Sequence, residues 1–195
     1  MFSKLVIATG NEGKYKEFTE IIKHIAGGDF AGEIVFAPDT AKFAVEETGK
    51  TYAENAMLKA KAWAEKTGLP CLSDDSGLEV MALGGAPGLF SARIVYGREI
   101  DKVAWLLSKM KGVSYRRARF SAALCLCVPC EYTLITEGYC MGTIADFPAG
   151  SNGFGYDPVF IPDGHELTFA ELPTSLKNDI SHRANAFRKM VYLLK

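Results

Sequence analysis

The sequence predicts a mixed α/β fold in which one sheet is flanked by helices. Short apolar runs typical of buried strands, such as residues 4–8, alternate with segments whose apolar residues recur at helical spacing. Residues 114–146 are rich in strand-like alternation. Because no repeat, low-complexity tract or long linker interrupts the 195 residues, we expect a single domain spanning 1–195, with two lobes and a strand-rich second lobe at roughly 114–146. A functional site would lie in the cleft between the lobes.

The first half of the chain predicts two strands and two helices. The apolar run at the N-terminus is followed by a glycine-containing turn and then by a helix, which a break at Gly27-Gly28 ends. Thr51, with Glu54 three residues later, forms a capping box that begins the second helix. The predicted elements are strands at 4–8 and 33–37, a helix carrying apolar Phe18, Ile21, Ile22 and Ile25, and a helix at 51–66.

The second half predicts more strands than helices. A short apolar run closes at Asp74 and Asp75, and the following Ser76-Gly77 predicts that this strand ends in a turn. The alternating segment predicts two antiparallel strands in 114–137, broken near 129–131, and a third strand at 138–145. The remaining predicted elements are a helix at 99–110, a glycine-rich loop at 148–157, a strand at 159–161 and a last helix that begins at Ser181 and buries Phe187, Met190, Val191 and Leu194.

Charge and hydropathy exclude some classes of partner. The 22 basic residues balance the 23 acidic ones, whereas a protein that coats a polyanion would be strongly basic, so we expect no nucleic-acid polymer as partner. No apolar run approaches the length of a membrane span, and the first residues reach glycine too soon for a signal peptide. We therefore expect no membrane partner and a cytoplasmic location.

The five cysteines leave two interpretations open. Cys125, Cys127 and Cys130 have the spacing C-x-C-x-x-C, which superficially suggests a zinc site. They lie, however, in an alternating stretch that places Cys125 and Cys127 on one face of a strand, and no second ligand pair follows. The pattern favours buried thiols that act as small hydrophobic residues.

The turn after the first strand has the features of an anion site. A glycine-bearing turn that leads into a helix presents backbone N–H groups and the positive end of the helix dipole to a ligand. Lys14 adds a charge and Asn11 a neutral donor, while Gly10 and Gly13 allow the backbone to approach a ligand closely. Two residues, rather than four, separate these glycines, and Tyr15 follows the lysine, so this is not a Walker P-loop. The alternative is an ordinary turn with a solvated lysine.

Carboxylates elsewhere must therefore hold any metal ion. Asp74 and Asp75 are adjacent, and consecutive residues of an extended chain point to opposite sides, so we expect them to have different roles. If Asp75 lies near Glu46 or Glu47, two carboxylates could bind Mg²⁺ together with water and phosphate oxygens. On the predicted helix, Lys59 is four residues after Asn55 and shares its face. The alternatives are a turn aspartate, a solvated acidic loop and a surface lysine.

Two further segments favour a ligand site near the C-terminus. In 153–158, Phe154 and Tyr156 alternate with glycines, which predicts either an aromatic platform for a base or a buried turn with packed rings. His182 and Arg183 follow the helix-capping Ser181, and their positive charge opposes the helix dipole. Such a local conflict is typical of a functional site.

The order of these segments identifies a family resemblance. The chain contains, in order, TGNEGK, EETGKTYAENAMLKA, DDSGLEVMALGGAPGLFSAR, RRARF, NGFGYDPVF and KNDISHR. It closely resembles the inosine triphosphate pyrophosphatase family, also called Ham1 or RdgB-like proteins, from about residue 6 to about residue 187. The resemblance implies an elongated mixed sheet with helices, two lobes with the site between them, and a homodimer. It also implies Mg²⁺-dependent hydrolysis of deaminated purine nucleotides (ITP, dITP, XTP) to the monophosphate and pyrophosphate.

The resemblance also implies roles for individual residues. Asp75 corresponds to the catalytic proton acceptor that also meets the metal, and Glu47 to the metal-binding glutamate, with Glu46 beside it as an ambiguity. Lys59 corresponds to a phosphate-contacting lysine and Ser76 to a substrate contact. The triphosphate would contact Thr9, Gly10, Asn11, Glu12, Gly13 and Lys14. The base and sugar would contact Phe154, Gly155, Tyr156, Asp157, Lys177, His182 and Arg183.

These roles combine into a hypothesis with two rivals. Asp75 would activate a water for in-line attack at phosphorus, while Lys14 and Lys59 neutralise charge on the leaving pyrophosphate. Arg183 would donate a hydrogen bond to the 6-oxygen of hypoxanthine or xanthine. Adenine has an amino group at position 6, so its N–H donors would face those of Arg183 without an acceptor. The rivals are a related pyrophosphatase with another base preference, such as a Maf-like enzyme, and a nucleotide-binding module without catalysis.

Overall fold

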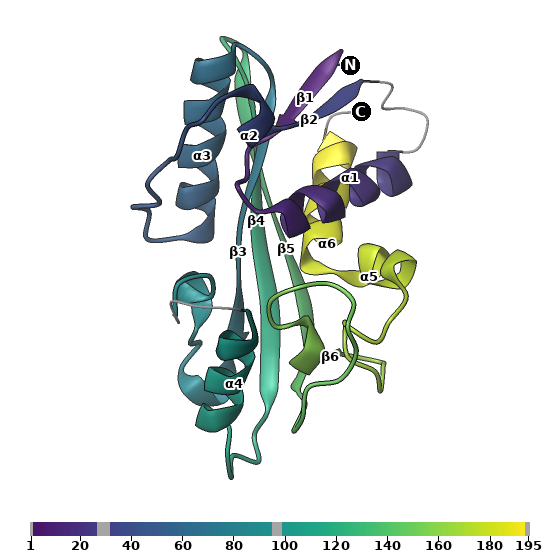
Figure 1. Cartoon of the computed structure of the whole chain (residues 1–195). Helices are drawn as coiled ribbons and strands as arrows, with labels where there is room; N and C mark the ends of the chain where they lie inside the picture. The colour runs from purple at the N-terminus through teal and green to yellow at the C-terminus, as the bar shows by residue number, and fades with distance from the viewer. Residues whose placement is uncertain (1, 27–31, 95–98, 194–195) are drawn as a thin grey trace. The chain divides into compact units, whose positions relative to one another are not determined.

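The computed structural model describes residues 2–26, 32–94 and 99–193. The strands of these residues form one sheet of order β2-β1-β3-β4-β5-β6 (Figure 1). The strands are β1 (Lys4–Ile7), β2 (Glu33–Phe36), β3 (Cys71–Val80), β4 (Arg117–Val128), β5 (Tyr132–Ile144) and β6 (Phe160–Pro162). The α-helices are α1 (Glu12–Ala26), α2 (Ala37–Thr40), α3 (Tyr52–Thr67), α4 (Glu99–Lys109), α5 (Thr174–Ile180) and α6 (His182–Leu193). Short 3-10 helices are η2 (Met81–Leu83), η3 (Gly88–Phe90) and η4 (Asp157–Val159). The predicted break at Gly27-Gly28 and the predicted core residue Leu194 lie outside the described residues.

The chain divides into two compact units, which we describe separately. Unit 1 comprises Met1–Asp75, Ala122–Gly138 and Arg183–Lys195, and unit 2 comprises Ser76–Ser121 and Tyr139–His182. The predicted strand-rich segment 114–146 supplies β4 and β5 and contributes residues to both units.

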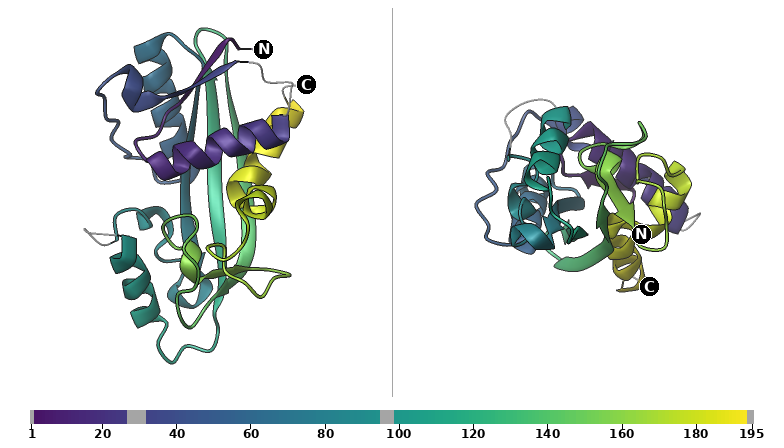
Figure 2. Two further views of the ribbon diagram at one scale, coloured as in Figure 1. Left: turned by 45° about the vertical axis from the view of Figure 1, so that its right-hand side comes forward. Right: turned by 90° about the horizontal axis from the view of Figure 1, so that it is seen from below.

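Unit 1 has helices on both faces of its part of the sheet, in which the first three strands are parallel. β1 pairs in parallel with β2 and with β3, and the last pair with β3 joins Ile7 to Leu72. One face carries α1 and α6, and the other carries α3 (Figure 1). In the turned view of Figure 2, α1 lies across the strands. The two core layers follow the alternation of the strands, because Leu5 and Ile7 pack under α1 whereas Val6 packs under α3.

The predicted helical spacing of α1 is confirmed in this core. Phe18, Ile21 and Ile22 are buried, and they pack with Phe187 and Met190 of α6. Burial of large apolar side chains stabilises a fold by roughly 1.5–3 kcal/mol each. This contact therefore fixes the start of α1, which carries the predicted anion site.

Unit 2 has its own core around aromatic rings. Phe120 lies 4.6 Å from Phe160 and 6.0 Å from Phe169, measured between ring centroids, and all three belong to one buried cluster. β5 pairs in an antiparallel manner with β6. Gly142 allows this close approach, because a Cβ at this position would lie 2.3 Å from the carbonyl oxygen of Ile161.

Three sequence predictions of secondary structure are wrong. β3 continues from Cys71 to Val80, so Ser76-Gly77 lies within a strand and not in a turn. Likewise β5 continues from Tyr132 to Ile144, and no third strand begins at Gly138. Glycine and serine favour turns but can also adopt extended backbone angles, and pairing within a sheet overrides the local preference. The helix α5 was not predicted, because its seven residues are too few to show helical periodicity.

The cysteines and the helices bear on two further expectations. Cys125 and Cys127 are buried in the same core layer, as predicted, and Cys130 is exposed. Burial, together with a smaller effect of the neighbouring Cys127, raises the pKa of the Cys125 thiol to about 12, so Cys125 is un-ionised near neutral pH.

Within the described parts of the chain, every helix is too short or too polar to cross a membrane.

Candidate active site

The predicted anion loop lies at the carboxyl end of β1 in unit 1. β1 ends at Ile7 and α1 begins at Glu12, so the loop opens where parallel α/β sheets place ligands. Asn11 caps the helix, since its Oδ1 accepts a hydrogen bond of 2.9 Å from the backbone N–H of Lys14. The cap fixes the first turn and leaves the amide nitrogen of Asn11 as a donor on the loop.

Lys14 is held by an ion pair with the first of the two aspartates. Its Nζ lies 3.0 Å from Oδ2 of Asp74, whose side chain is fully buried. The same carboxylate oxygen accepts a hydrogen bond of 3.1 Å from Nε of Arg183. Nη1 of Arg183 reaches Oε2 of Glu17 at 2.9 Å. This buried network joins α1, β3 and α6 and sets the direction of the Lys14 ammonium group.

The network has clear electrostatic consequences. Burial alone would raise the pKa of Asp74, but Lys14 and Arg183 oppose it and hold the pKa far below the usual range. Burial lowers the pKa of Lys14, Asp74 opposes this effect, and the nearby cations Arg183 and Lys59 lower the pKa further. An additional anion at this loop, such as a phosphate, would favour the charged lysine.

Asp75 contacts helix α3, and the expectation that the two aspartates have different roles stays a prediction. Oδ2 of Asp75 accepts a hydrogen bond of 2.9 Å from Nδ2 of Asn55 in α3, and Asp75 is 7% exposed. Nearby, Lys59 of the same helix forms a short ion pair with Glu47. Thr51 caps α3 by accepting a hydrogen bond from the backbone N–H of Glu54, which is one half of the predicted capping box. The Glu54 side chain accepts a hydrogen bond from the backbone N–H of Lys50, one residue before the cap.

Asp75 is more basic than an ordinary aspartate. Burial raises its pKa, Lys59 and the hydrogen bond from Asn55 lower it in part, and the negative charge of Glu47 raises it again. This coupling places Glu47 close enough to Asp75 for their charges to interact. Glu46, in contrast, is exposed, so the structure favours Glu47 as the partner of Asp75.

The carboxylates Glu47 and Asp75 match the donor chemistry that Mg²⁺ prefers. Mg²⁺ is usually bound by one or two carboxylates and keeps its other positions for water and phosphate oxygens. Among the residues that the structure describes, no group of three or more His, Cys, Asp or Glu side chains could enclose a metal ion. The donor set fits an ion shared with a phosphate ligand better than a closed structural site.

Unit 2 contains a second group of predicted site residues. Oδ2 of Asp157 accepts hydrogen bonds from Nζ of Lys177 at 2.6 Å and from the backbone N–H of Phe154 at 2.8 Å. The Lys177 ammonium lies 5.1 Å from the centroid of the Phe154 ring. Gly153 has φ of +73°, and a Cβ there would lie 2.0 Å from the Asp157 carboxylate, so only glycine fits this turn. Three predicted base and sugar contacts are therefore brought together.

Tyr156 and His182 are packed in the core of unit 2. Tyr156 is 4% exposed, and its hydroxyl donates a hydrogen bond of 3.3 Å to the carbonyl oxygen of Ser91. The alternative interpretation of a packed ring therefore holds for Tyr156, whereas Phe154 is only partly buried. The ring of His182 is stacked on Phe120 at 4.7 Å with an interplanar angle of 10°.

The structure thus collects the predicted residues into two groups. In unit 1, Lys14, Glu47, Lys59, Asp75 and Arg183 belong to one network of contacts and charges. In unit 2, Phe154, Asp157 and Lys177 form the second group, and Ser76 follows directly after Asp75 in β3. The predicted cleft between the lobes stays a prediction.

Sequence reasoning missed one residue of the unit 1 network, Glu17, and the partner of another, Asn55. Glu17 contacts Arg183, and its position four residues before Ile21 places a carboxylate on the buried stripe of α1, which was a usable signal. Asn55 was predicted only as a donor beside Lys59. Its bond to Asp75 joins a helix to a strand 20 residues away, and no local pattern indicates that pair.

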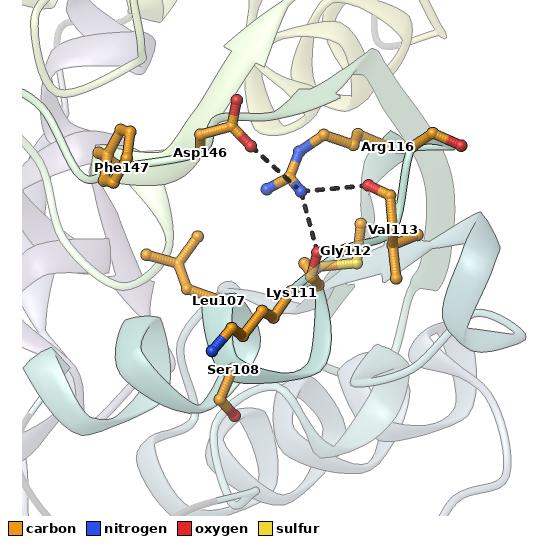
Figure 3. A pocket seen from close by; sticks show the side chains of 10 residues that line it. Leu107, Ser108, Lys111, Gly112, Val113, Arg116, Asp146 and Phe147 are labelled. Carbon is orange, nitrogen blue, oxygen red and sulfur yellow. Dashed lines mark hydrogen bonds and ion pairs between the residues drawn. The ribbon is translucent and has the colours of Figure 1, made fainter.

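Unit 2 also has an open pocket of about 520 Å³, and none of the predicted site residues line it (Figure 3). Arg116 forms one wall. Its guanidinium donates to the carbonyl oxygens of Ile144, Ala145 and Met110 at 2.6, 2.7 and 3.1 Å, and it pairs with Asp146 at 3.4 Å. These bonds occupy most of its donors, so Arg116 joins the end of β5 to the segment after α4.

Comparisons with known proteins place this arrangement among known enzymes. The sequence profile of the Ham1 family matches residues 5–193. A protein of Bacillus subtilis (strain 168) named dITP/XTP pyrophosphatase is 42% identical over 201 residues, which cover 100% of this chain and 98% of that protein. A protein of Prochlorococcus marinus (strain NATL1A) with the same name is also 42% identical, over 98% of this chain and 93% of the relative.

Solved structures show the same fold. The Ham1 protein of Staphylococcus aureus matches with a TM-score of 0.83 at 36% identity, over 98% of this chain and 97% of that one. A HAM1 protein of Coxiella burnetii matches with a TM-score of 0.85 at 36% identity, over 100% and 98% of the two chains. The predicted mixed sheet flanked by helices is confirmed.

Proposed function

The chain belongs to the Ham1 family, and on this basis we propose that it removes deaminated purine nucleotides from the nucleotide pool. Like the relatives named dITP/XTP pyrophosphatase, it is a nucleoside triphosphate pyrophosphatase, a hydrolase of acid anhydrides. The proposed substrates are ITP, dITP and XTP, the proposed products are the monophosphate and pyrophosphate, and the proposed cofactor is Mg²⁺.

Asp75 is the observation that carries this proposal. A buried carboxylate with a raised pKa, next to a second carboxylate and two lysines, is a strong candidate for a general base. Asp75 would take the proton from the water that attacks phosphorus, while its hydrogen bond from Asn55 holds the carboxylate in one orientation. The lysines would balance the charge that develops on the leaving pyrophosphate.

Glu47 and Asp75 would hold the metal ion. When bound, Mg²⁺ would neutralise charge on the phosphate oxygens, as it does in other phosphoryl-transfer sites. The ion pair between Lys59 and Glu47 supports this assignment, because the charge of Lys59 also acts on Asp75. Both carboxylates therefore lie near the same ammonium group. With Glu47 engaged as a metal ligand, Lys59 would contact a phosphate oxygen.

Binding of the triphosphate falls to the loop at the end of β1. The backbone N–H groups at the start of α1, with Lys14, favour an anion. Asp74 would keep Lys14 directed at the loop through its 3.0 Å ion pair. Such positioning supplies most of the rate in phosphoryl transfer, where little covalent help is needed.

The base and sugar would be bound by the polar group of unit 2 and by Arg183. Asp157, Lys177 and Phe154 form a polar group beside an aromatic ring, which suits contacts with a base and its sugar. Arg183 is the proposed donor to the 6-oxygen of the base, and an unpaired donor facing adenine would cost about 1–3 kcal/mol. Two buried carboxylates already contact Arg183, so its direction is fixed before the base binds.

A substrate panel tests the proposed function. Initial rates of pyrophosphate release would be measured on ITP, XTP, dITP, GTP and ATP, each with Mg²⁺ and with EDTA. We expect the first three to be hydrolysed at least about 10-fold faster than ATP in kcat/KM, which corresponds to about 1.4 kcal/mol, and no turnover in EDTA. Equal rates on all five, or full activity in EDTA, would refute the substrate class or the metal requirement respectively.

The proposal also includes a homodimer in the cytoplasm, where free nucleotides are used. Light scattering after gel filtration would test the dimer, which should have twice the 21.2 kDa mass of the chain. A mass of one chain at micromolar concentration would contradict it.

A further inference from the structure

One buried side chain contacts both parts of the proposed metal site. Asn55 of α3 is 2% exposed, and its Nδ2 donates to Oδ2 of Asp75 at 2.9 Å. Its Oδ1 accepts a hydrogen bond of 2.8 Å from the backbone N–H of Gly49. Gly49 is two residues after Glu47, so the two ends of one amide group join the proposed base to the loop that carries the second carboxylate.

We propose that Asn55 is a positioning residue, which orients the Asp75 carboxylate and holds the Glu47 loop beside it before metal or nucleotide binds. This inference rests on the proposed function, because that function assigns the metal ion and the water to Asp75 and Glu47. Asn55 would act through Asp75 and Glu47 and would not itself take or give the proton.

The chemistry of the contact requires an amide at this position. Asparagine offers a donor and an acceptor on one short, rigid group, and here each is used once. A leucine of similar size would offer neither. An aspartate would accept from Gly49 but would place a second negative charge against Asp75. Asparagine is also a poor helix former, so its presence in the first turns of α3 is explained by these contacts rather than by helix propensity.

The Glu47 loop is attached to α3 at further points. Oε2 of Glu54 accepts a hydrogen bond of 2.5 Å from the backbone N–H of Lys50, and Lys59 pairs with Glu47 itself. Gly49 packs so closely on the helix that an added Cβ would lie 2.7 Å from Oδ1 of Asn55. Asn55 contacts both this loop and Asp75, so its loss should separate the two carboxylates while the other attachments keep the loop on the helix.

The test compares metal binding and turnover in the full-length protein. Asn55→Leu removes both hydrogen bonds at similar size. Asn185→Leu on α6 is the matched control, because the Asn185 amide accepts a hydrogen bond from Arg188 of the same helix and is not among the residues assigned to the site. Binding of Mn²⁺ alone would be measured by electron paramagnetic resonance without nucleotide, kcat and KM would be measured on ITP with Mg²⁺, and thermal unfolding would be followed in EDTA.

We expect the dissociation constant for Mn²⁺ to rise about 10-fold in Asn55→Leu, since partners that orient metal ligands are typically worth 10–100-fold in affinity or activity. We expect kcat to fall by a similar factor and KM for ITP to change by less than about 3-fold, because the triphosphate contacts of the Lys14 loop remain. The control should match the wild type in all three measurements. Wild-type Mn²⁺ affinity together with wild-type kcat in the folded Asn55→Leu protein would overturn the inference.

A second variant covers the case in which Asn55→Leu fails to fold. Gly49→Ala keeps the Asn55 amide, but its Cβ would lie 2.7 Å from Oδ1 of Asn55, 2.7 Å from Cβ of Glu54 and 2.9 Å from the backbone nitrogen of Asn55, so the loop has to move away from Asn55. The backbone at Gly49 has no positive φ that would add strain. The same rise in the Mn²⁺ dissociation constant is expected, and its absence would overturn the inference. If the wild type neither binds Mn²⁺ nor hydrolyses ITP, the proposed function itself fails. If the wild type does both and the variants equal it, only the role of Asn55 fails.

Discussion

Asp74 and Asp75 are neighbours in β3 with opposite electrostatic situations. Asp74 is paired with Lys14 and Arg183, and its pKa lies far below the usual range. Burial instead raises the pKa of Asp75, despite Lys59 and the bond from Asn55. One aspartate therefore stabilises the fold as an anion, whereas the other carries its charge at the expense of stability. In active sites, the catalytic residue is typically the one whose charge is unfavourable for stability, which here is Asp75.

We predict that neutralising the two residues changes stability in opposite directions. Asp74→Asn should lower the free energy of unfolding by about 3 kcal/mol at pH 7, because it leaves two buried cations without their shared anion. Asp75→Asn should leave that free energy unchanged or raise it, since a carboxylate with a raised pKa destabilises the fold when ionised. Urea unfolding in EDTA would measure both. A larger loss for Asp75→Asn than for Asp74→Asn would contradict these assignments.

The depressed pKa of Asp74 also predicts a pH dependence. A group whose pKa is lower in the folded protein than its ordinary value of 3.8 adds stability above that value, and this stability is lost as the pH falls toward the folded pKa. The urea midpoint of the wild type should therefore drop from about pH 5 downward. The drop should be smaller in Asp74→Asn, and superimposable pH profiles for the two proteins would remove Asp74 as a cause.

Sequence alone identified the polar residues but not their partners. The glycine turn after a strand predicted Lys14, and the acidic pair predicted Asp75, because both signals are local. The bond between Asp74 and Arg183 joins positions 109 residues apart, and no periodicity or spacing indicates such a contact. Sequence reasoning therefore assigned Arg183 to the base, without its contacts to Asp74 and Glu17.

Helix α3 is the element that assembles the unit 1 site. Asn55 and Lys59 lie four residues apart on its inner face, and they contact Asp75 and Glu47. Its other buried positions, such as Ala56, Ala60 and Trp63, pack on the sheet. The orientation of the helix, fixed by this packing, determines where both contacts fall.

Loss of the N-cap of α3 should weaken the fold by a small and measurable amount. Thr51→Ala removes the acceptor for the backbone N–H of Glu54, and such losses typically cost about 1 kcal/mol. Thr51→Ser keeps the acceptor and should resemble the wild type. Equal unfolding free energies for the alanine and serine variants, measured with urea, would show that the cap contributes nothing.

The predicted elements succeeded where a long periodic pattern supported them. The helical stripe of α1 and the capping box of α3 lie where the sequence placed them. The prediction failed at Ser76-Gly77, because these residues favour turns by local preference, whereas the surrounding sheet holds them in a strand. Residues 71–80 are almost entirely buried, and their backbone stays extended through Gly77.

At the scale of the whole molecule, the order of motifs was more informative than any single motif. Each of the anion loop, the acidic pair and the aromatic-glycine loop has an ordinary structural alternative. Their succession along nearly the whole chain matched one family, which the Ham1 profile over residues 5–193 and the solved structures confirm. The strand order β2-β1-β3-β4-β5-β6 was not predictable, since pairing between distant strands depends on tertiary packing.

Hydrolysis of dITP, with its products identified, tests the central claim most directly. Wild type and Asp75→Asn would be incubated with dITP and Mg²⁺, and nucleotides and phosphates would be separated by ion-exchange chromatography. The account predicts equal amounts of dIMP and pyrophosphate from the wild type and a rate lower by about 10² or more in Asp75→Asn, as expected for the loss of a general base. Release of dIDP and inorganic phosphate, or full activity of Asp75→Asn, would contradict it.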